Sequence, residues 1–123
     1  GLVFNFSLPG SHKYNIILYF IELDPAVGSG SRLFDVNMDG KLIVRNVDIF
    51  DDSSGLYYAY TVFSSSAFGP FVDYVHISLT PSNSTVYLPS LSALELMQLF
   101  DSPMLVPTLL DDGMYVLPFQ VLI

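Results

Sequence analysis

The sequence contains no cysteine, and only four of its 123 residues are basic. Without cysteine there is no disulfide bond, thiolate metal site or cysteine nucleophile, and this absence is compatible with either redox compartment. Nucleic acids are bound mainly through lysine and arginine contacts to phosphates, so a formal net charge of −8 excludes nucleic acid as the expected partner. The same charge disfavours anionic lipid head groups.

Long apolar runs are also missing. No stretch reaches the about 18 apolar residues needed to cross a bilayer, and the longest candidate, residues 15–23, is interrupted by Glu22. Charged residues make up 13% of the chain, about half of the usual share, while hydrophobic residues make up 51%. A chain of this length and composition suits one folded domain. We expect no membrane insertion, and some apolar surface that packs against another molecule.

The sequence is rich in short strand-forming segments separated by turn residues. Residues 14–22 are mostly β-branched or aromatic, and residues 72–79 alternate between two faces. Asp39-Gly40 lies between two such segments and is typical of a hairpin turn. This pattern predicts an all-β sandwich or barrel. Further strands are expected at 32–37, 42–44, 47–50 and 57–63, with loops at 51–55 and 64–70 and a turn at 80–85.

Residues 91–100 are ambiguous, because their leucine, alanine, glutamate and methionine favour a helix by propensity although a strand is also possible. Beyond Asp101 the pattern loosens, and the chain ends in an apolar run. We expect residues 1–100 to form the β domain. Residues 101–123 are expected to be either an added edge strand or an apolar tail that docks on a neighbour.

Three segments occur in an informative order. They read YNIILYFIEL at 14–23, SRLFDVNMDGK at 31–41, and LTPSNST at 79–85 followed by LPSLSALEL at 88–96. In sequence, order and spacing they resemble the latter part of the malectin-like domains, which occur in plant receptor-like kinases and related secreted proteins. The resemblance implies an antiparallel, jelly-roll-like β-sandwich, in which residues 91–99 form a strand despite their helical propensity.

The sequence departs from that family at two points. The family domain has a further N-terminal portion with its own strands, which this sequence does not show, and Ser92 stands where the family usually has asparagine. Much of the sugar-contacting aromatic set in malectin lies in that portion. The resemblance therefore transfers no individual sugar-binding residue to this chain.

Two Asn-x-Ser/Thr triplets, beginning at Asn5 and Asn83, match the acceptor motif for N-glycosylation. The second lies beside Pro81 in a serine-rich turn, where a glycan would be exposed. We predict both asparagines as glycosylation sites, in a protein that is secreted or lies in the lumen of the secretory pathway.

The densest aromatic stretch follows a pair of acidic residues. Aromatic faces stack on the C–H groups of a sugar ring and carboxylates accept hydrogen bonds from its hydroxyls, although core packing is the commoner role for most such aromatic residues. The predicted ligand-binding residues are Tyr57, Tyr58, Asp51, Asp52 and Phe68.

Two acidic groups could hold calcium. Residues 35–40 match the opening of an EF-hand loop, but Asn46 stands where a bidentate acid is needed, and strands are expected where helices should flank the loop. Asp48 with Asp51 and Asp52 could supply oxygen ligands, but solvated loop acids are commoner. We expect no metal and no other cofactor.

Catalytic residues are sparse. His12 and His76 lack the context of a nucleophilic triad. Glu22 and Glu95 are the only glutamates; they could act as a glycosidase carboxylate pair, but solvation at strand ends, with Glu95 pairing Arg32, is favoured. Residues 28–30 lack the lysine and helix of a phosphate-binding loop. We expect a protein that is not an enzyme.

The leading hypothesis is a non-catalytic extracellular recognition module that binds carbohydrate or a protein or peptide through loops at one end of a β-sandwich. The alternative is a structural subunit of a filament or of a larger homo- or hetero-oligomer. Scarce charge, the apolar tail and the missing N-terminal strands, which another chain could supply by strand addition, favour that alternative.

Overall fold

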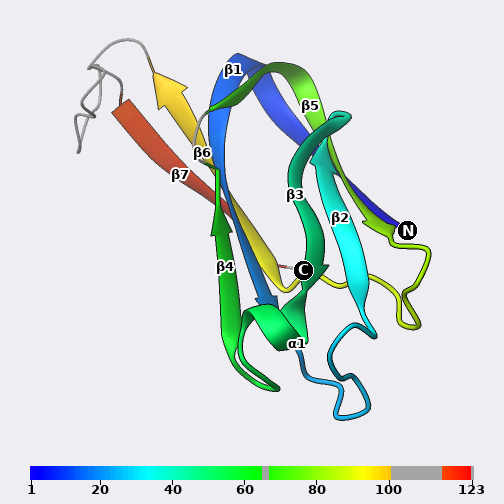
Figure 1. Ribbon diagram of the computed structural model, residues 1–123. Coiled ribbons are helices and arrows are strands. Elements are labelled where there is room, and N and C mark those ends of the chain that lie inside the picture. Colours follow the sequence, from blue (N-terminus) through cyan, green and yellow to red (C-terminus); the bar gives the residue numbers. More distant parts are fainter. Residues whose placement is uncertain (65–66, 101–114, 123) are drawn as a thin grey trace.

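The structure is a computed structural model that describes residues 1–64, 67–100 and 115–122 (Figure 1). Pro9, Phe100 and residues 115–122 are described by their backbone alone. The elements in chain order are β1 (Leu2–Ile21), β2 (Leu33–Met38), β3 (Lys41–Asp48), α1 (Ile49–Asp52), β4 (Ala59–Phe63), β5 (Phe68–Pro81), β6 (Ala93–Phe100) and β7 (Tyr115–Leu122).

All described strand pairs are antiparallel and belong to one seven-stranded sheet, in the order β3-β2-β5-β1-β6-β7 with β4 also paired to β1. The expected all-β antiparallel fold is confirmed. The finer expectation of a sandwich is not, because hydrogen bonding joins the strands into a single curled sheet. Figure 1 shows β1 and β5 curving over together at the top of the molecule.

The 20-residue strand β1 connects the two halves of the sheet. Its residues 2–14 pair with β5, and its residues 14–21 pair with β6 and β4. The register between β1 and β5 shifts between Ser7 and Ser11, where Gly10 has a φ of +71°. Bulges of this kind bend a strand and increase its twist, which explains why the sheet curls here.

The core lies inside the curl and draws on both halves of the sheet. Alternate residues of β1, including Leu18 and Phe20, are fully buried together with residues of β2, β5 and β6. The Phe20 ring lies 5.8 Å from Phe34 and 6.0 Å from Tyr60, between ring centroids. On β5 the predicted alternation is confirmed: Val75, Ile77 and Leu79 are buried, whereas Tyr74 and His76 are exposed.

The predicted hairpin at Asp39-Gly40 is confirmed. Both residues have positive φ, 48° and 80°, as a type I′ turn requires, and Met38 pairs with Lys41. The acids of the EF-hand-like pattern accept hydrogen bonds from backbone amides. Asp39 accepts from the amide of His76 at 2.8 Å, and Asp35 accepts from the amide of Asn46 at 2.7 Å.

Several predicted boundaries are wrong. The segment 47–50 is not one strand, because β3 ends at Asp48 and α1 begins at Ile49. Strand β4 begins at Ala59, since Tyr57 has a φ of +68°. Strand β5 begins at Phe68, inside the expected loop 64–70, through pairing with Tyr14.

Residues 93–100 form strand β6, as the family resemblance implied, although their propensity favours a helix. The strand pairs with β1 on one side and with β7 on the other. Of the expected C-terminal tail, residues 115–122 form β7, and residues 101–114 and 123 lie outside the described residues. No helix in the described part of the chain has the length and apolar character that a membrane span needs.

Candidate functional site

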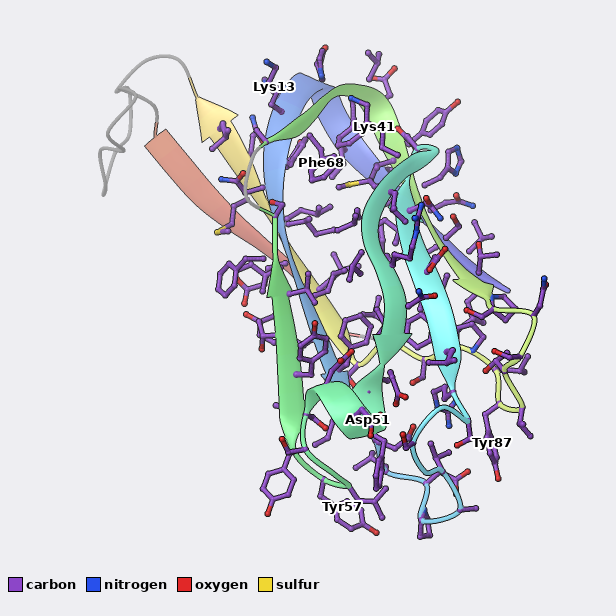
Figure 2. All side chains as sticks on the ribbon, in the orientation of Figure 1. Lys13, Lys41, Asp51, Tyr57, Phe68 and Tyr87 are labelled. Atoms are coloured by element: carbon purple, nitrogen blue, oxygen red, sulfur yellow. The ribbon has the colours of Figure 1, made fainter. Side chains whose placement is uncertain are left out.

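Three connecting segments meet at one end of the sheet, which we call the loop end: residues 22–32, residues 49–58 and residues 82–92. Backbone bonds hold them together, since the amide of Tyr57 donates to the carbonyl of Glu22 at 2.9 Å and the amide of Val86 donates to that of Ser31 at 2.9 Å. Figure 2 shows Asp51, Tyr57 and Tyr87 at this end, and Lys13, Lys41 and Phe68 at the opposite end.

A buried ion pair lies at the centre of the loop end. Arg32 Nε donates to Glu22 Oε1 at 2.8 Å and Arg32 Nη2 donates to Glu22 Oε2 at 3.3 Å, and Glu22 is only 2% exposed. The guanidinium also donates to the carbonyl of Leu88 and lies 5.6 Å from the centre of the Tyr87 ring. The pair therefore ties the end of β1 to both the start of β2 and the segment 82–92.

Two expectations about the glutamates are wrong. Arg32 pairs with Glu22 and not with Glu95, whose Oε1 accepts from the Tyr19 hydroxyl at 2.7 Å. Glu22 is buried rather than solvated at the end of its strand. Both carboxylates thus make structural contacts within the described residues.

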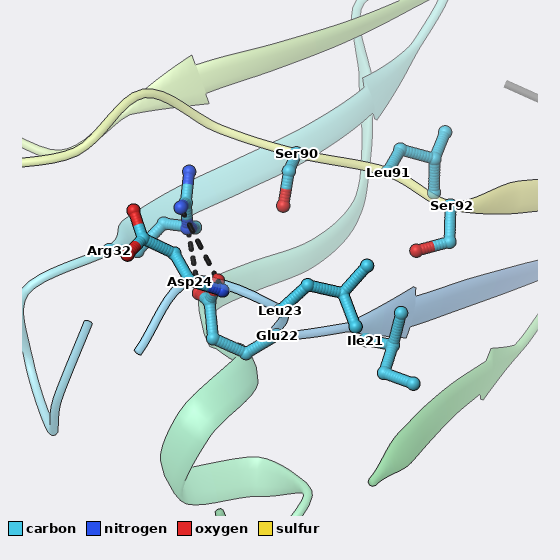
Figure 3. Close-up of a pocket in the computed structure, with 8 residues that line it drawn as sticks. All are labelled: Ile21, Glu22, Leu23, Asp24, Arg32, Ser90, Leu91 and Ser92. Atoms are coloured by element: carbon cyan, nitrogen blue, oxygen red, sulfur yellow. Dashed lines mark hydrogen bonds and ion pairs between the residues drawn. The ribbon is translucent and has the colours of Figure 1, made fainter. Parts of the chain in front are cut away.

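An open pocket of about 430 Å³ lies against this ion pair (Figure 3). The end of β1 forms one side and the segment before β6 forms the other. Its walls combine aliphatic side chains, serine hydroxyls and charged groups, with one more carboxylate than cations. The lining residues are Ile21, Glu22, Leu23, Asp24, Arg32, Ser90, Leu91 and Ser92.

Four of the five predicted ligand-binding residues lie together at the loop end. Tyr57 and Tyr58 are 61% and 62% exposed, and Asp51 and Asp52 are exposed on α1. The structure separates Phe68 from them: it begins β5, pairs with Tyr14 and packs in part against the core.

The acids that could supply calcium ligands accept hydrogen bonds from backbone amides. Asp48 accepts from the amide of Asp51 at 3.2 Å and from that of Gly30 at 2.7 Å, and Asp52 accepts from the amide of Asp48 at 3.0 Å. These bonds cap α1 and hold the 23–32 loop against it. Among the described residues, no group of three or more His, Cys, Asp or Glu side chains is placed to bind a metal ion.

Among the described side chains, three tyrosines have a raised pKa. The hydrogen bond to Glu95 is the main cause for Tyr19, because the phenolate form cannot donate it and would face a negative charge. Burial is the main cause for Tyr14 and Tyr60, and the charge of Asp52 adds to it for Tyr60.

Arg32, Ser90 and Ser92 were not predicted as site residues. One signal for Arg32 is present in the sequence: Glu22 ends an apolar strand, and a buried carboxylate requires a partner. No local signal marks the serines, because their place in the pocket depends on the pairing of β6 with β1.

Comparison with known proteins defines the class of the chain. A model of the malectin domain family matches residues 2–69, which is more than half of the chain. The chain belongs to the malectin domain family, and the resemblance noted in the sequence is confirmed.

Among curated proteins, the chain is similar to a nodulation receptor kinase of Pisum sativum. The two are 30% identical over 87 residues, which is 71% of this chain. The chain spans only 9% of the length of that relative. No solved structure matches the chain.

Proposed function

We propose that the chain is a non-catalytic extracellular recognition module, and that its loop end binds a neutral carbohydrate or a similarly polar, uncharged part of a protein or peptide. The observation that carries the proposal is the open pocket at the loop end, the end where two exposed tyrosines also lie. Membership in the malectin domain family and the similarity to a receptor kinase support an extracellular setting.

The lining of the pocket favours hydroxyl-rich ligands. The hydroxyls of Ser90 and Ser92 can donate and accept hydrogen bonds, and the carboxylate of Asp24 can accept them. The charge of Arg32 is balanced by Glu22, so Asp24 leaves the pocket with an excess negative charge. Anionic ligands are therefore disfavoured.

The exposed rings of Tyr57 and Tyr58 lie at the same end of the sheet as the pocket (Figure 2). Aromatic side chains bury a large area against a ligand and offer a flat apolar face with a polar tip. Small-molecule sites commonly combine such apolar surface with a few polar groups that orient the ligand.

Binding to an array of neutral oligosaccharides, with a peptide library in parallel, tests the proposal. We expect Tyr57→Ala and Ser92→Ala to weaken binding of the selected ligand several-fold each, because a contact of about 1 kcal/mol corresponds to about a fivefold change in Kd. Tyr74→Ala, which removes an exposed tyrosine on β5, is the matched control and should leave Kd unchanged. Equal affinity for all three variants would contradict the proposal, as would a lack of binding to every probe.

The alternative function, a subunit of a larger assembly, rests on a different observation. Within the described residues β4 pairs with β1 alone, and Phe63 on β4 is 67% exposed. An exposed, uncharged strand edge can pair with a strand of another chain. Sedimentation velocity over a wide concentration range tests this function: a monomer throughout would reject it, and concentration-dependent assembly that Thr61→Pro abolishes would support it.

A further inference from the structure

The outer face of the β1–β5 pair carries exposed apolar side chains outside the loop end. Val3 on β1 and Val72 and Tyr74 on β5 are 62%, 60% and 55% exposed. Exposed apolar side chains that lie together often mark a surface that contacts another group. Asn5 lies in its middle, since it follows Val3 by two residues and pairs with His76.

The Asn-x-Ser triplet of β1 presents its two functional side chains on this face. Alternate residues of a strand point to the same side, and both Asn5 and Ser7 are exposed. Phe6 between them points the other way and packs in part against the core. A substituent on Asn5 would therefore project from the outer face without displacing a core residue.

The side chain of Asn5 makes a contact through its oxygen atom. Its Oδ1 contacts Nδ1 of His76, which leaves Nδ2, the atom that a glycan modifies, directed away from this contact. The ring of Tyr74 lies 5.0 Å from the His76 ring, between centroids, in an edge-to-face arrangement. Tyr74 also pairs with Ser7, so its ring is a diagonal neighbour of Asn5 and within reach of a group attached there.

We propose that Asn5 carries an N-linked glycan whose first sugar lies over Tyr74 and Val3 and covers this face. The modification requires the secretory route and so rests on the extracellular part of the proposed function. In the transfer, Nδ2 of Asn5 loses a proton and bonds to the anomeric carbon of an N-acetylglucosamine. The bond from that carbon to a phosphate oxygen of the lipid-linked oligosaccharide breaks, and the lipid pyrophosphate leaves.

Chemistry explains why the sugar would stay on this face. The C–H side of a pyranose ring is apolar and can pack on the ring of Tyr74 and the methyl groups of Val3, while its hydroxyls remain in water. The bond between His76 and Asn5 restricts the rotamers of the asparagine. A sugar on a restricted side chain loses less conformational entropy when it packs on its neighbours.

Glycopeptide mapping tests whether Asn5 is glycosylated. The protein used has no substitutions and is secreted from cultured animal cells. Enzymatic release of the glycan should convert Asn5 to aspartate, and intact mass should fall by one oligosaccharide at this site. In an Asn83→Gln background, Ser7→Thr should keep the oligosaccharide and Ser7→Ala should lose it, although both retain Asn5 and its contact to His76. An Asn5 peptide that is never modified in the secreted chain would overturn the proposal.

Thermal unfolding tests whether the first sugar packs on Tyr74. Glycoprotein trimmed to the single N-acetylglucosamine should unfold a few degrees above the Ser7→Ala protein, and Tyr74→Ser should remove this difference. Equal Tm values, or a difference that persists in Tyr74→Ser, would overturn the packing of the sugar on Tyr74.

Ligand binding separates this proposal from the proposed function. Ser7→Ala protein made in bacteria carries no glycan, so the oligosaccharide array can be applied to it directly. If this protein binds an oligosaccharide but Asn5 is unmodified in the secreted protein, the glycan proposal is rejected and the recognition function stands. A glycosylated Asn5 without any ligand binding would support the glycan and reject the recognition function.

Discussion

The pair of Glu22 and Arg32 joins three segments of the chain through two side chains. The carboxylate is almost fully buried, and the guanidinium is largely covered. Removal of one partner of a buried pair leaves the other charge without compensation, which costs more than the pair contributes in net stability. The same pair lines the pocket, so its geometry also sets the shape of the candidate site.

We predict that Arg32→Met lowers the free energy of unfolding by about 3 kcal/mol or more, because it leaves the Glu22 carboxylate buried and unpaired. Urea denaturation measures this change. Lys41→Met removes an exposed lysine and should change stability by less than about 0.5 kcal/mol. The double variant of Arg32→Met and Glu22→Gln should recover part of the loss, and a single variant as stable as the Lys41 control would refute the prediction.

The hydroxyl of Tyr19 gives a pH-dependent prediction. Its pKa is raised above the ordinary 10.0, first by the hydrogen bond to Glu95 and then by burial and by the charge of that residue. Because the folded pKa exceeds the unfolded one, the unfolded chain loses the proton first as pH rises. The contribution of this bond to the free energy of unfolding is therefore fully present below pH 10, the ordinary pKa, and is lost as pH rises through the folded pKa.

We predict that Glu95→Ala lowers the pKa of Tyr19, because it removes both the acceptor of the hydroxyl's hydrogen bond and the negative charge that disfavours the phenolate. A pH titration of the tyrosine ring-carbon NMR signals, assigned with a Tyr19→Phe variant, measures both values. A Tyr19 signal that titrates at the same pH in both proteins would rule out Glu95 as the cause.

At the scale of the element, the short helix α1 depends on Asp48. This residue caps the helix through the amide of Asp51 and also binds the amide of Gly30, so one side chain serves two segments. A four-residue helix has little stability of its own. Its position at the loop end, with Asp51 and Asp52 exposed beside the tyrosines, therefore rests on this cap.

We predict that Asp48→Ala destabilises the protein by about 1–2 kcal/mol, the usual effect of removing an N-cap residue. Asp48→Asn keeps a good capping side chain and should retain most of the stability. Urea unfolding compares the three proteins, and hydrogen exchange at the Gly30 and Asp51 amides should accelerate in the alanine variant alone. Equal exchange in both variants would show that the cap does not hold the loop.

At the scale of the whole molecule, β1 makes the two halves of the sheet interdependent. It pairs with β5 in one half and with β4 and β6 in the other, and its alternate residues enter a single buried cluster. Neither half can bury its apolar face without the other.

We predict that the described fold unfolds in one cooperative transition. Urea curves followed by backbone circular dichroism and by tyrosine fluorescence should coincide, as two-state unfolding requires. Two separated transitions would show that the halves fold independently.

Much of the fold follows from local patterns. Alternation identified the strand at residues 72–79, and the need for positive φ at two consecutive turn residues identified the Asp39-Gly40 hairpin. Composition alone does not decide residues 93–100, whose side chains favour a helix. They form a strand because β1 and β7 satisfy their backbone on both sides.

The candidate site was only partly predictable. Tyr57, Tyr58, Asp51 and Asp52 are close in sequence, and the structure keeps them together at the loop end. Phe68 is only ten residues beyond Tyr58, but β4 carries the chain to the other end of the sheet before β5 begins. Short sequence separation therefore says little about proximity once a strand intervenes.

The sequence by itself determined the all-β class, the family, the hairpin and the negative net charge. Periodicity and turn chemistry are properties of neighbouring residues, and net charge is a property of composition. Only the tertiary structure decided that Arg32 pairs with Glu22, that Ser90 and Ser92 line a pocket with them, and that Asn5 lies beside Tyr74 and His76. These contacts join residues far apart in the chain. Their partners are selected by strand register and by the bend of β1, which no local pattern specifies.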